Sequence, residues 1–200
     1  MLTVGFDLDM TIVDSRPGIR ASMRALADES GVPIDIDVVI GRLGQKLEWE
    51  IAQWFPADQV EPMSARYRAH YWDQCVGDGT LLLPGARAAV DAVRARDGRV
   101  VVVTAKSEAL AFRCIDSVRL EVDAVVGYVH GDEKRDALVE HTAAIYVGDT
   151  ITDIRSAIDA SAIAVGVTTG TDDARALLAA GADIVLDSLD EFPAWLATIG

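Results

Sequence analysis

From residue 99 onward, short apolar runs alternate with segments whose apolar residues recur at helical spacing. The apolar runs are RVVVVTA (99–105), VDAVVGYV (122–129), AAIYVGD (143–149), AIAVGV (162–167) and DIVL (183–186). The intervening segments 107–118, 133–141, 152–160, 172–181 and 189–199 are predicted helices, the last interrupted near Pro193. Continuous apolar runs are typical of strands buried on both faces of a parallel sheet. The alternation predicts βαβ units, and therefore an α/β fold with a doubly wound, Rossmann-like parallel sheet.

Residues 16–79 break this alternation and show no strand pattern. Apolar residues fall on helical faces in three places: Ile19, Met23 and Leu26; Leu47, Ile51, Trp54 and Phe55; Met63, Tyr67 and Tyr71. The segment also holds half of the aromatic residues of the chain, which we expect to form its own core. We predict a small helical cap at 16–79, inserted into a core domain made of 1–15 and 80–200.

The charge of the chain limits its partners. Its 200 residues carry a formal net charge of −14 and a pI of about 4.5. Nucleic acids and anionic membrane surfaces attract clustered Lys and Arg, so neither is an expected partner. Cys75, Cys114 and the three histidines lack zinc-site spacing, and no apolar run approaches a membrane-spanning length. The first residues do not resemble a signal peptide, and we expect a cytoplasmic protein without membrane association.

Polar side chains follow three of the predicted strands. Asp7 and Asp9 end the apolar run that opens the chain, Thr104 follows the run at 100–103, and Asp149 ends the run at 143–148. Ligands of open parallel sheets bind at the carboxyl ends of the strands. If these strands are neighbours, their polar side chains converge on one site.

The side chains at these strand ends suit a hard cation and a phosphoryl group. Asp7, Asp9 and Asp149 offer oxygen ligands without His or Cys, which favours Mg²⁺ over Zn²⁺. The Thr104 hydroxyl, the backbone N–H at Ala105 and the Lys134 ammonium group suit phosphoryl oxygens. We list these three as candidate substrate-binding residues.

The order and placement of these motifs resemble those of the haloacid dehalogenase superfamily. The matching stretches are DLDMT (7–11), VVTAK (102–106), Lys134 and VGDTITD (147–153), with a helical insertion after the first. The resemblance is closest to the branch that contains phosphoglycolate phosphatase and β-phosphoglucomutase. The closing stretch GADIVLDSLDEF (181–192) is similar to the C-terminal end of proteins of that branch. The match covers essentially the whole chain.

The resemblance implies a mechanism. Asp7 is the implied nucleophile, attacking phosphorus to form an aspartyl-phosphate. Asp9 is the implied general acid, which later deprotonates the attacking water. The Asp7 side chain, the Asp9 backbone carbonyl and Asp149 are the implied Mg²⁺ ligands. Asp153 is implied to lie behind Asp149 as an orienting residue, with Lys134 as a possible partner.

Two positions leave alternatives open. Lys134 lacks the proline that often follows this lysine in related proteins, and Lys106 is the alternative phosphate-binding cation. We rank Lys106 second, because it points away from Thr104 if the strand continues. Met10 stands where the family usually has glycine, which demands room for a side chain at that turn but removes no ligand.

The cap is expected to act as a lid, because it enters the chain directly past Asp9. Its loop GRLGQK (41–46) joins two predicted helices, and Arg42 or Lys46 is a candidate contact for an anionic group of the substrate. An ordinary solvated loop is the equally weighted alternative.

These features predict a Mg²⁺-dependent phosphatase that hydrolyses a small phosphorylated metabolite, a phosphomonoester. A phosphomutase acting on a sugar phosphate is the enzymatic alternative. A phospho-accepting signalling or binding domain is the non-enzymatic alternative, since such a domain also uses Asp, Mg²⁺, Thr and Lys on a parallel sheet. The acid at Asp9 and the predicted lid argue against it.

Overall fold

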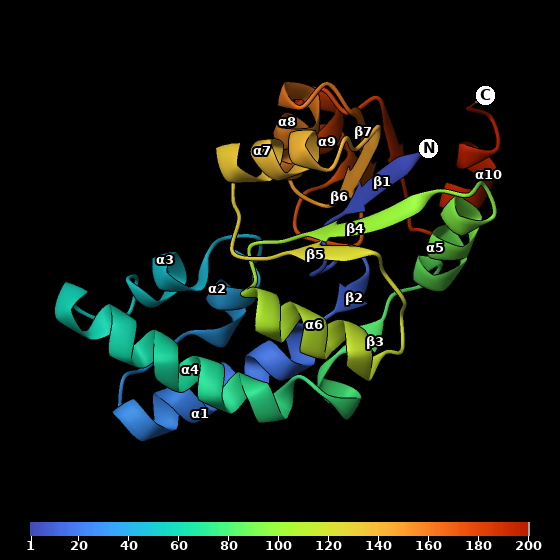
Figure 1. The fold of residues 1–200 in the computed structure, drawn as a ribbon. Coiled ribbons are helices and arrows are strands. Elements are labelled where there is room, and N and C mark those ends of the chain that lie inside the picture. The colour runs from blue at the N-terminus through green and yellow to red at the C-terminus, as the bar shows by residue number, and fades with distance from the viewer. Residues whose placement is uncertain (200) are drawn as a thin grey trace.

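A computed structural model describes residues 1–199 and contains a six-stranded parallel sheet in the order β5-β4-β1-β6-β7-β8 (Figure 1). The strands are β1 (Thr3–Phe6), β4 (Arg99–Val103), β5 (Ala124–Val126), β6 (Ile145–Gly148), β7 (Ile163–Val167) and β8 (Ile184–Leu186). Strand β1 lies at the centre and pairs with β4 on one side and β6 on the other. Its four residues are all buried, as expected for a strand covered on both faces.

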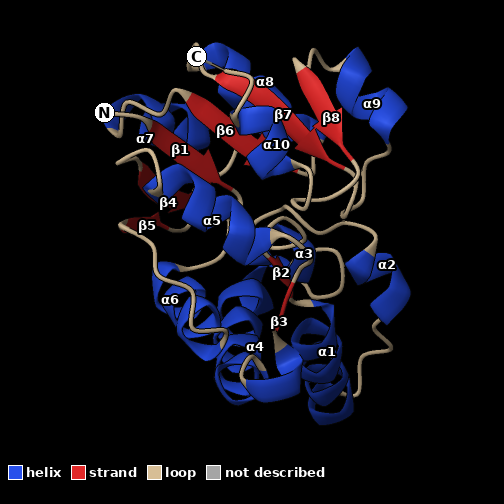
Figure 2. Ribbon diagram, turned by 90° about the vertical axis from the view of Figure 1, so that its right-hand side faces the viewer, coloured by secondary structure: helices blue, strands red, loops and turns tan. Residues whose placement is uncertain are grey.

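Helices cover both faces of the sheet (Figures 1 and 2). One face carries α5 (Ala86–Arg94), α6 (Glu108–Ser117) and α10 (Phe192–Leu196), and the other carries α7 (Asp132–Glu140), α8 (Ile151–Asp159) and α9 (Ala174–Ala179). Alternate residues of β4 separate into the two cores: Val100 and Val102 belong to the first, and Val101 and Val103 to the second. The predicted α/β fold with a doubly wound parallel sheet is confirmed.

The structure differs from the sequence prediction in several elements. Helix α5 and an antiparallel pair formed by β2 (Val13–Asp14) and β3 (Leu81–Leu82) were not predicted. Strands of two residues are too short to show any periodicity. The predicted helix 189–199 is wrong in extent, because α10 spans only Phe192–Leu196. Pro193 lies in its first turn, where a missing N–H costs no helical hydrogen bond.

Four helices lie beside the carboxyl ends of the sheet strands (Figure 2). They are α1 (Arg16–Ser30), α2 (Ile36–Ile40), α3 (Leu47–Ile51) and α4 (Val60–Gln74), with 3₁₀ turns at Ala57–Gln59 and Gly77–Gly79. Phe55, Tyr67 and Tyr71 are buried among them. Trp49 and Trp72 are 45% exposed, so the expectation that all the aromatic residues of this segment form its core is wrong. Arginine side chains lie over both indole rings, Arg42 on Trp49 and Arg113 on Trp72.

Met10 adopts a left-handed backbone conformation with φ of 64° while its side chain is buried. A Cβ atom makes this conformation unfavourable, which explains why glycine suits the turn after Asp9. The turn is held by hydrogen bonds from Met10 N to the carbonyl of Val13 and from the Thr169 hydroxyl to the carbonyl of Met10.

We expect Met10→Gly to be more stable than Met10→Ala by about 1 kcal/mol. Both variants remove the Met10 side chain beyond its Cβ atom. The difference between their free energies of unfolding therefore reports the cost of a Cβ at positive φ, minus the additional conformational entropy that glycine loses on folding. Urea denaturation of the two purified variants measures the difference. An equal or greater stability of Met10→Ala would show that the turn carries no such strain.

Candidate active site

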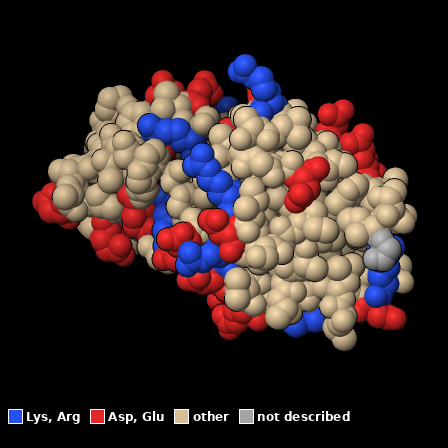
Figure 3. All heavy atoms as spheres, turned by 90° about the horizontal axis from the view of Figure 1, so that it is seen from above, with Lys and Arg blue, Asp and Glu red and all other residues tan. Residues whose placement is uncertain are grey.

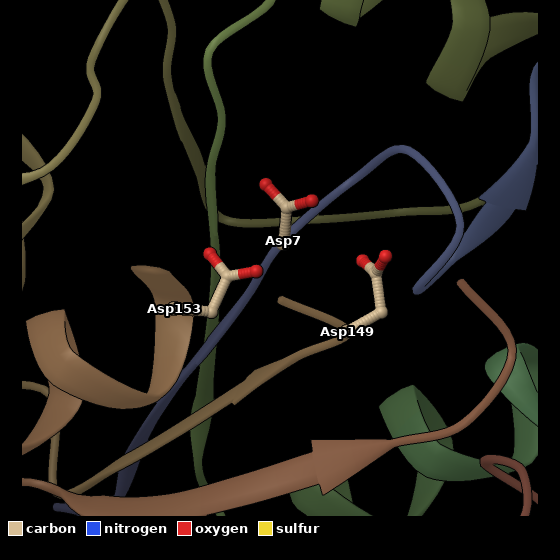
Figure 4. Close-up of side chains that lie close together, drawn as sticks. All are labelled: Asp7, Asp149 and Asp153. Carbon is tan, nitrogen blue, oxygen red and sulfur yellow. The ribbon is translucent and has the colours of Figure 1, made fainter. Parts of the chain in front are cut away.

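Three carboxylates meet where β1 and β6 end. Asp7 follows β1 and Asp149 follows β6, and the backbone N–H of Asp7 donates to the carbonyl of Val147 at 2.8 Å. With Asp153 on the first turn of α8, they each present an oxygen within 4.8 Å of the others (Figure 4). All three residues are buried. The structure therefore brings together Asp7, Asp149 and Asp153 from three segments of the sequence.

Asp153 uses both of its carboxylate oxygens within the protein. One oxygen accepts from the Thr150 N–H and hydroxyl, as part of a capping box at the start of α8. The other accepts from the Lys134 ammonium group at 2.6 Å and from the Tyr146 hydroxyl at 3.2 Å. Asp153 is therefore better suited to orient Lys134 than to bind a metal ion. A Cβ at Gly148 would lie 2.4 Å from the Asp153 Cβ, so this packing requires glycine.

Lys134 is a fully enclosed cation at this site. Its Nζ lies 2.8 Å from Asp7 Oδ1 and 2.6 Å from Asp153 Oδ1, and the residue is 2% exposed. Burial alone would lower the pKa of Lys134, but the charges of Asp153 and Asp7 raise it well above its ordinary value. The ammonium group therefore stays charged beside Asp7.

Asp149 accepts a hydrogen bond from one hydroxyl group and packs closely against one glycine. Its Oδ1 accepts a hydrogen bond from the buried Thr11 hydroxyl at 2.9 Å. A Cβ at Gly170 would lie 1.7 Å from Asp149 Oδ2, so only a residue without a side chain allows the carboxylate to take this position. Burial, followed by the charges of Asp7 and Asp153, raises the pKa of Asp149 well above its ordinary value.

The site has more negative charge than its own cation balances. Asp7, Asp149 and Asp153 face one ammonium group, that of Lys134. Burial raises the pKa of Asp7 to about 7, with Lys134 opposing the effect and Asp153 adding to it. A divalent cation would balance the excess charge, and a donor set of carboxylate oxygens without His or Cys suits a hard ion. The residues present therefore fit a divalent metal ion between Asp7 and Asp149.

The Asp9 carboxylate lies outside this group of three. It forms an ion pair with Lys106, whose Nζ is 3.0 Å from Asp9 Oδ1 and 2.8 Å from the Tyr71 hydroxyl. Any contribution of Asp9 to the metal site would come from its backbone carbonyl, as the resemblance implies. Asp7 and Asp9 thus have different partners. Side chains two residues apart would point to the same face of a continuing strand, but β1 ends at Phe6 and the chain turns there.

Lys106 lies at the site although it ranked second in the sequence analysis. That ranking assumed that Lys106 would point away from Thr104 in a continuing strand. The assumption was wrong, because side chains two residues apart in a strand point to the same face, and β4 in any case ends at Val103. The chain then turns, and the Lys106 N–H donates to the Thr104 hydroxyl. Lys106 reaches Asp9, while Lys134 approaches Asp7.

A cavity of about 780 Å³, counted to its open mouth, lies over these residues. Its floor includes Asp7, Asp9, Thr104 and Ala105, and Thr104 and Ala105 are themselves buried. Helices α1–α4 and the loop at 41–46 supply much of the wall. Lys134 and Asp149 are buried and do not line the cavity.

The loop at 41–46 contacts residues 128–133 through its backbone and Lys46. His130 Nδ1 lies 3.1 Å from the carbonyl oxygen of Gly44, and Lys46 forms an ion pair with Glu133 at 2.6 Å. The Lys46 ammonium group also lies 4.5 Å from the centre of the Tyr128 ring. Lys46 is therefore engaged outside the cavity, whereas Arg42 lines it.

Charges of both signs lie next to each other on the surface. Figure 3 shows Lys and Arg in a narrow band beside Asp and Glu, rather than in a broad basic patch on that face. Among residues 1–199, no helix is both long and apolar enough to cross a membrane.

Comparisons with known proteins agree on one family. The profile of the haloacid dehalogenase-like hydrolase family matches residues 4–167. The chain is 31% identical to a plasmid-encoded phosphoglycolate phosphatase of Cupriavidus necator, with 95% of this chain and 90% of that protein covered. It is 28% identical to a phosphoglycolate phosphatase of Chromobacterium violaceum, with 94% of this chain and 93% of that protein covered.

Solved structures share the fold over nearly the full chain. A haloacid dehalogenase-like hydrolase of Streptococcus pneumoniae superposes with a TM-score of 0.84 at 24% identity, covering 98% of both chains. A putative β-phosphoglucomutase of Thermotoga maritima gives a TM-score of 0.73 at 20% identity, covering both chains fully.

Proposed function

The chain belongs to the haloacid dehalogenase-like hydrolase family, and from this membership we propose that it is a Mg²⁺-dependent phosphatase of a small phosphorylated metabolite. Family and relatives together identify the protein as a phosphatase enzyme. The observation that carries the finer proposal is the setting of Asp7. Its carboxylate lies under a cavity, beside Lys134 and Asp149, at the carboxyl end of the central strand.

Asp7 is the proposed nucleophile. Its carboxylate oxygen attacks phosphorus, the bond from phosphorus to the leaving oxygen breaks, and Asp9 gives that oxygen a proton. In the second step Asp9 takes a proton from water, which attacks the phosphorus of the aspartyl-phosphate. Phosphate leaves and the Asp7 carboxylate is restored. Asp7 contacts Lys134 and Asp9 contacts Lys106, so the two carboxylates occupy different parts of the site, as two separate roles require.

Asp7, Asp149 and the Asp9 backbone carbonyl are the proposed Mg²⁺ ligands. When bound, the ion offsets the repulsion between carboxylates and phosphate and stabilises negative charge in the transition state. Thr11 holds Asp149 in place through its hydroxyl. Asp153 supports the site indirectly, because it fixes the Lys134 ammonium group.

Lys134, the Thr104 hydroxyl and the backbone N–H of Ala105 are the proposed phosphoryl-binding groups. Lys134 already lies 2.8 Å from Asp7 Oδ1, so its charge is next to the position of the reacting phosphorus. Thr104 and Ala105 line the cavity above Asp7. These groups stabilise charge that spreads over the phosphoryl oxygens as the leaving bond breaks.

Residues 16–79 are the proposed cap and 1–15 with 80–200 the proposed core domain. The chain passes between these two parts twice. The β2–β3 pair, in which Val13 is opposite Leu82, holds the two connecting segments side by side. Closure of the cap would exclude water while the aspartyl-phosphate forms. The polar contacts of His130 with Gly44 and of Lys46 with Glu133 support such a closed arrangement.

A panel of phosphorylated metabolites tests the proposal. We expect phosphate release with Mg²⁺, a loss of at least about 100-fold when a chelator removes the ion, and recovery when excess Mg²⁺ is added. Released phosphate is measured in each case. Unchanged release in the presence of chelator would contradict the metal assignment. Product analysis with a sugar monophosphate separates hydrolysis from phosphoryl transfer between sugar hydroxyls, which is the result expected of a mutase.

A further inference from the structure

Arg42 lines the cavity but is already held by a buried carboxylate. Its Nε and Nη2 atoms donate to the two oxygens of Glu50 at 2.9 and 2.5 Å. Glu50 is 6% exposed and also accepts a hydrogen bond from the Trp54 indole at 2.8 Å. The planar, bidentate arrangement is the strongest geometry for this kind of ion pair.

Two indole rings further fix the Arg42 guanidinium group. Its central carbon lies 5.7 Å from the ring centres of both Trp49 and Trp54. A substrate carboxylate that took the paired Nε and Nη2 donors of Arg42 would displace Glu50 and leave it buried without a charge partner. Such an exchange is costly, since an unpaired buried charge is far less favourable than a paired one.

The other cations that line the cavity are also paired. Among residues 1–199, the Lys and Arg residues of the cavity wall are Arg42, Arg68 and Lys106. Arg68 forms an ion pair with Glu48, and Lys106 pairs with Asp9. Each cation of the wall therefore faces a carboxylate of the protein itself.

The remainder of the wall beyond the phosphoryl-binding floor is largely apolar. The apolar and aromatic residues that line it include Ile19, Met23, Val39, Leu47, Tyr67 and Leu110. Such a surface favours contact with apolar atoms of a leaving group and gains nothing from a negative charge there.

We propose that Glu50 is a specificity-determining residue, which occupies Arg42 and thereby directs the enzyme to phosphomonoesters with an uncharged, partly apolar leaving group. This inference rests on the proposed phosphatase function. Several relatives are named phosphoglycolate phosphatase, and phosphoglycolate carries a carboxylate on its leaving group. The pairing of Arg42 with Glu50 disfavours that substrate in this chain.

Matched esters test the proposal on the wild-type enzyme. Phosphoglycolate is compared with its uncharged amide, phosphoglycolamide, and with propyl phosphate, all with Mg²⁺. We expect kcat/KM for the two uncharged esters to exceed that for phosphoglycolate at least tenfold. A preference for phosphoglycolate would overturn the proposal. If no phosphomonoester at all is hydrolysed, the proposed function fails instead, and the two failures are thus distinguishable.

The variant Glu50→Gln frees Arg42 from its charge partner. We expect kcat/KM for phosphoglycolate to rise at least tenfold, mainly through a lower KM, while the values for the uncharged esters change less than threefold. In the double variant Arg42→Gln/Glu50→Gln this gain should disappear. Glu29→Gln removes another carboxylate that pairs with arginine, on the exposed surface, and serves as the matched control.

Two results for the variants would overturn the proposal. One is an equal rise for all three esters in Glu50→Gln, and the other is a gain that persists in the double variant. Circular dichroism establishes that each variant is folded before its kinetics are compared. If Glu50→Gln does not fold, the wild-type comparison of the matched esters decides alone.

Discussion

Replacing Asp7 with asparagine is expected to lower kcat by on the order of 10⁴-fold or more, because an amide cannot form the aspartyl-phosphate. The two side chains have nearly the same shape, so Asp7→Asn should fold and still bind substrate. Single-turnover phosphate release and substrate-binding calorimetry measure the two properties separately. Asp58→Asn, at an exposed 3₁₀ turn, is the control. Activity of Asp7→Asn within tenfold of wild type would assign the nucleophile elsewhere.

Asp7→Asn should also change how the free energy of unfolding depends on pH when a chelator keeps the site free of metal. Burial raises the pKa of Asp7 from 3.8 to about 7, so the folded protein holds a proton that the unfolded chain releases. The stabilisation from this proton is complete below pH 4 and is lost as the pH rises to about 7.

Asp7→Asn should therefore show a shallower fall of the free energy of unfolding between pH 4 and pH 7 than wild type does. Asp149 has a raised pKa for the same physical reason, and the loss of the Asp7 charge also reduces its shift. Urea denaturation at several pH values measures the slope. Identical slopes in the two proteins would show that Asp7 does not titrate in this range.

Replacing Lys134 with methionine should remove both activity and stability. The variant leaves Asp7 and Asp153 buried without their shared cation, which typically costs about 3–5 kcal/mol. It also removes a charge that stabilises the phosphoryl group, for which we expect a loss of about 10²–10³-fold in kcat. Denaturation and steady-state kinetics measure the two effects.

The double variant Lys134→Met/Asp153→Asn separates these two contributions. It removes one carboxylate together with the cation, so stability should recover in part while activity should not. If both activity and stability of Lys134→Met match wild type, the ammonium group has neither role. A parallel recovery of activity in the double variant would contradict a direct role of Lys134 at the phosphoryl group.

The sequence contained enough to predict where Asp7 and Asp149 meet. Each ends an apolar run, and the order of strands in a doubly wound sheet brings their carboxyl ends together. The position of Lys106 was mispredicted, because side-chain alternation was misapplied: residues 104 and 106 are two apart and would share a face of a continuing strand, and the chain turns after Val103. Helix α5 has a regular apolar face at Ala86, Ala89, Val90 and Val93, but the prediction missed it.

Other parts of the site depend on contacts between residues far apart in the sequence. The hydrogen bond from Thr11 to Asp149 joins side chains 138 residues apart. The pairing of Arg42 with Glu50 depends on how the chain turns between α2 and α3, and no periodic pattern encodes that turn. The sequence analysis named Arg42 or Lys46 as a candidate contact for an anionic group of the substrate, with a solvated loop as the alternative, whereas packing determines that the anion beside Arg42 is Glu50.

The close approach of Gly170 to Asp149 has a consequence for how mutational scans of this protein should be interpreted. Position 170 contributes no functional group, yet any side chain there would push aside a carboxylate of the proposed metal site. Loss of activity across all substitutions would make this glycine look as indispensable as the aspartates. Sensitivity at a position can therefore reflect the space that chemistry needs rather than the groups that perform it.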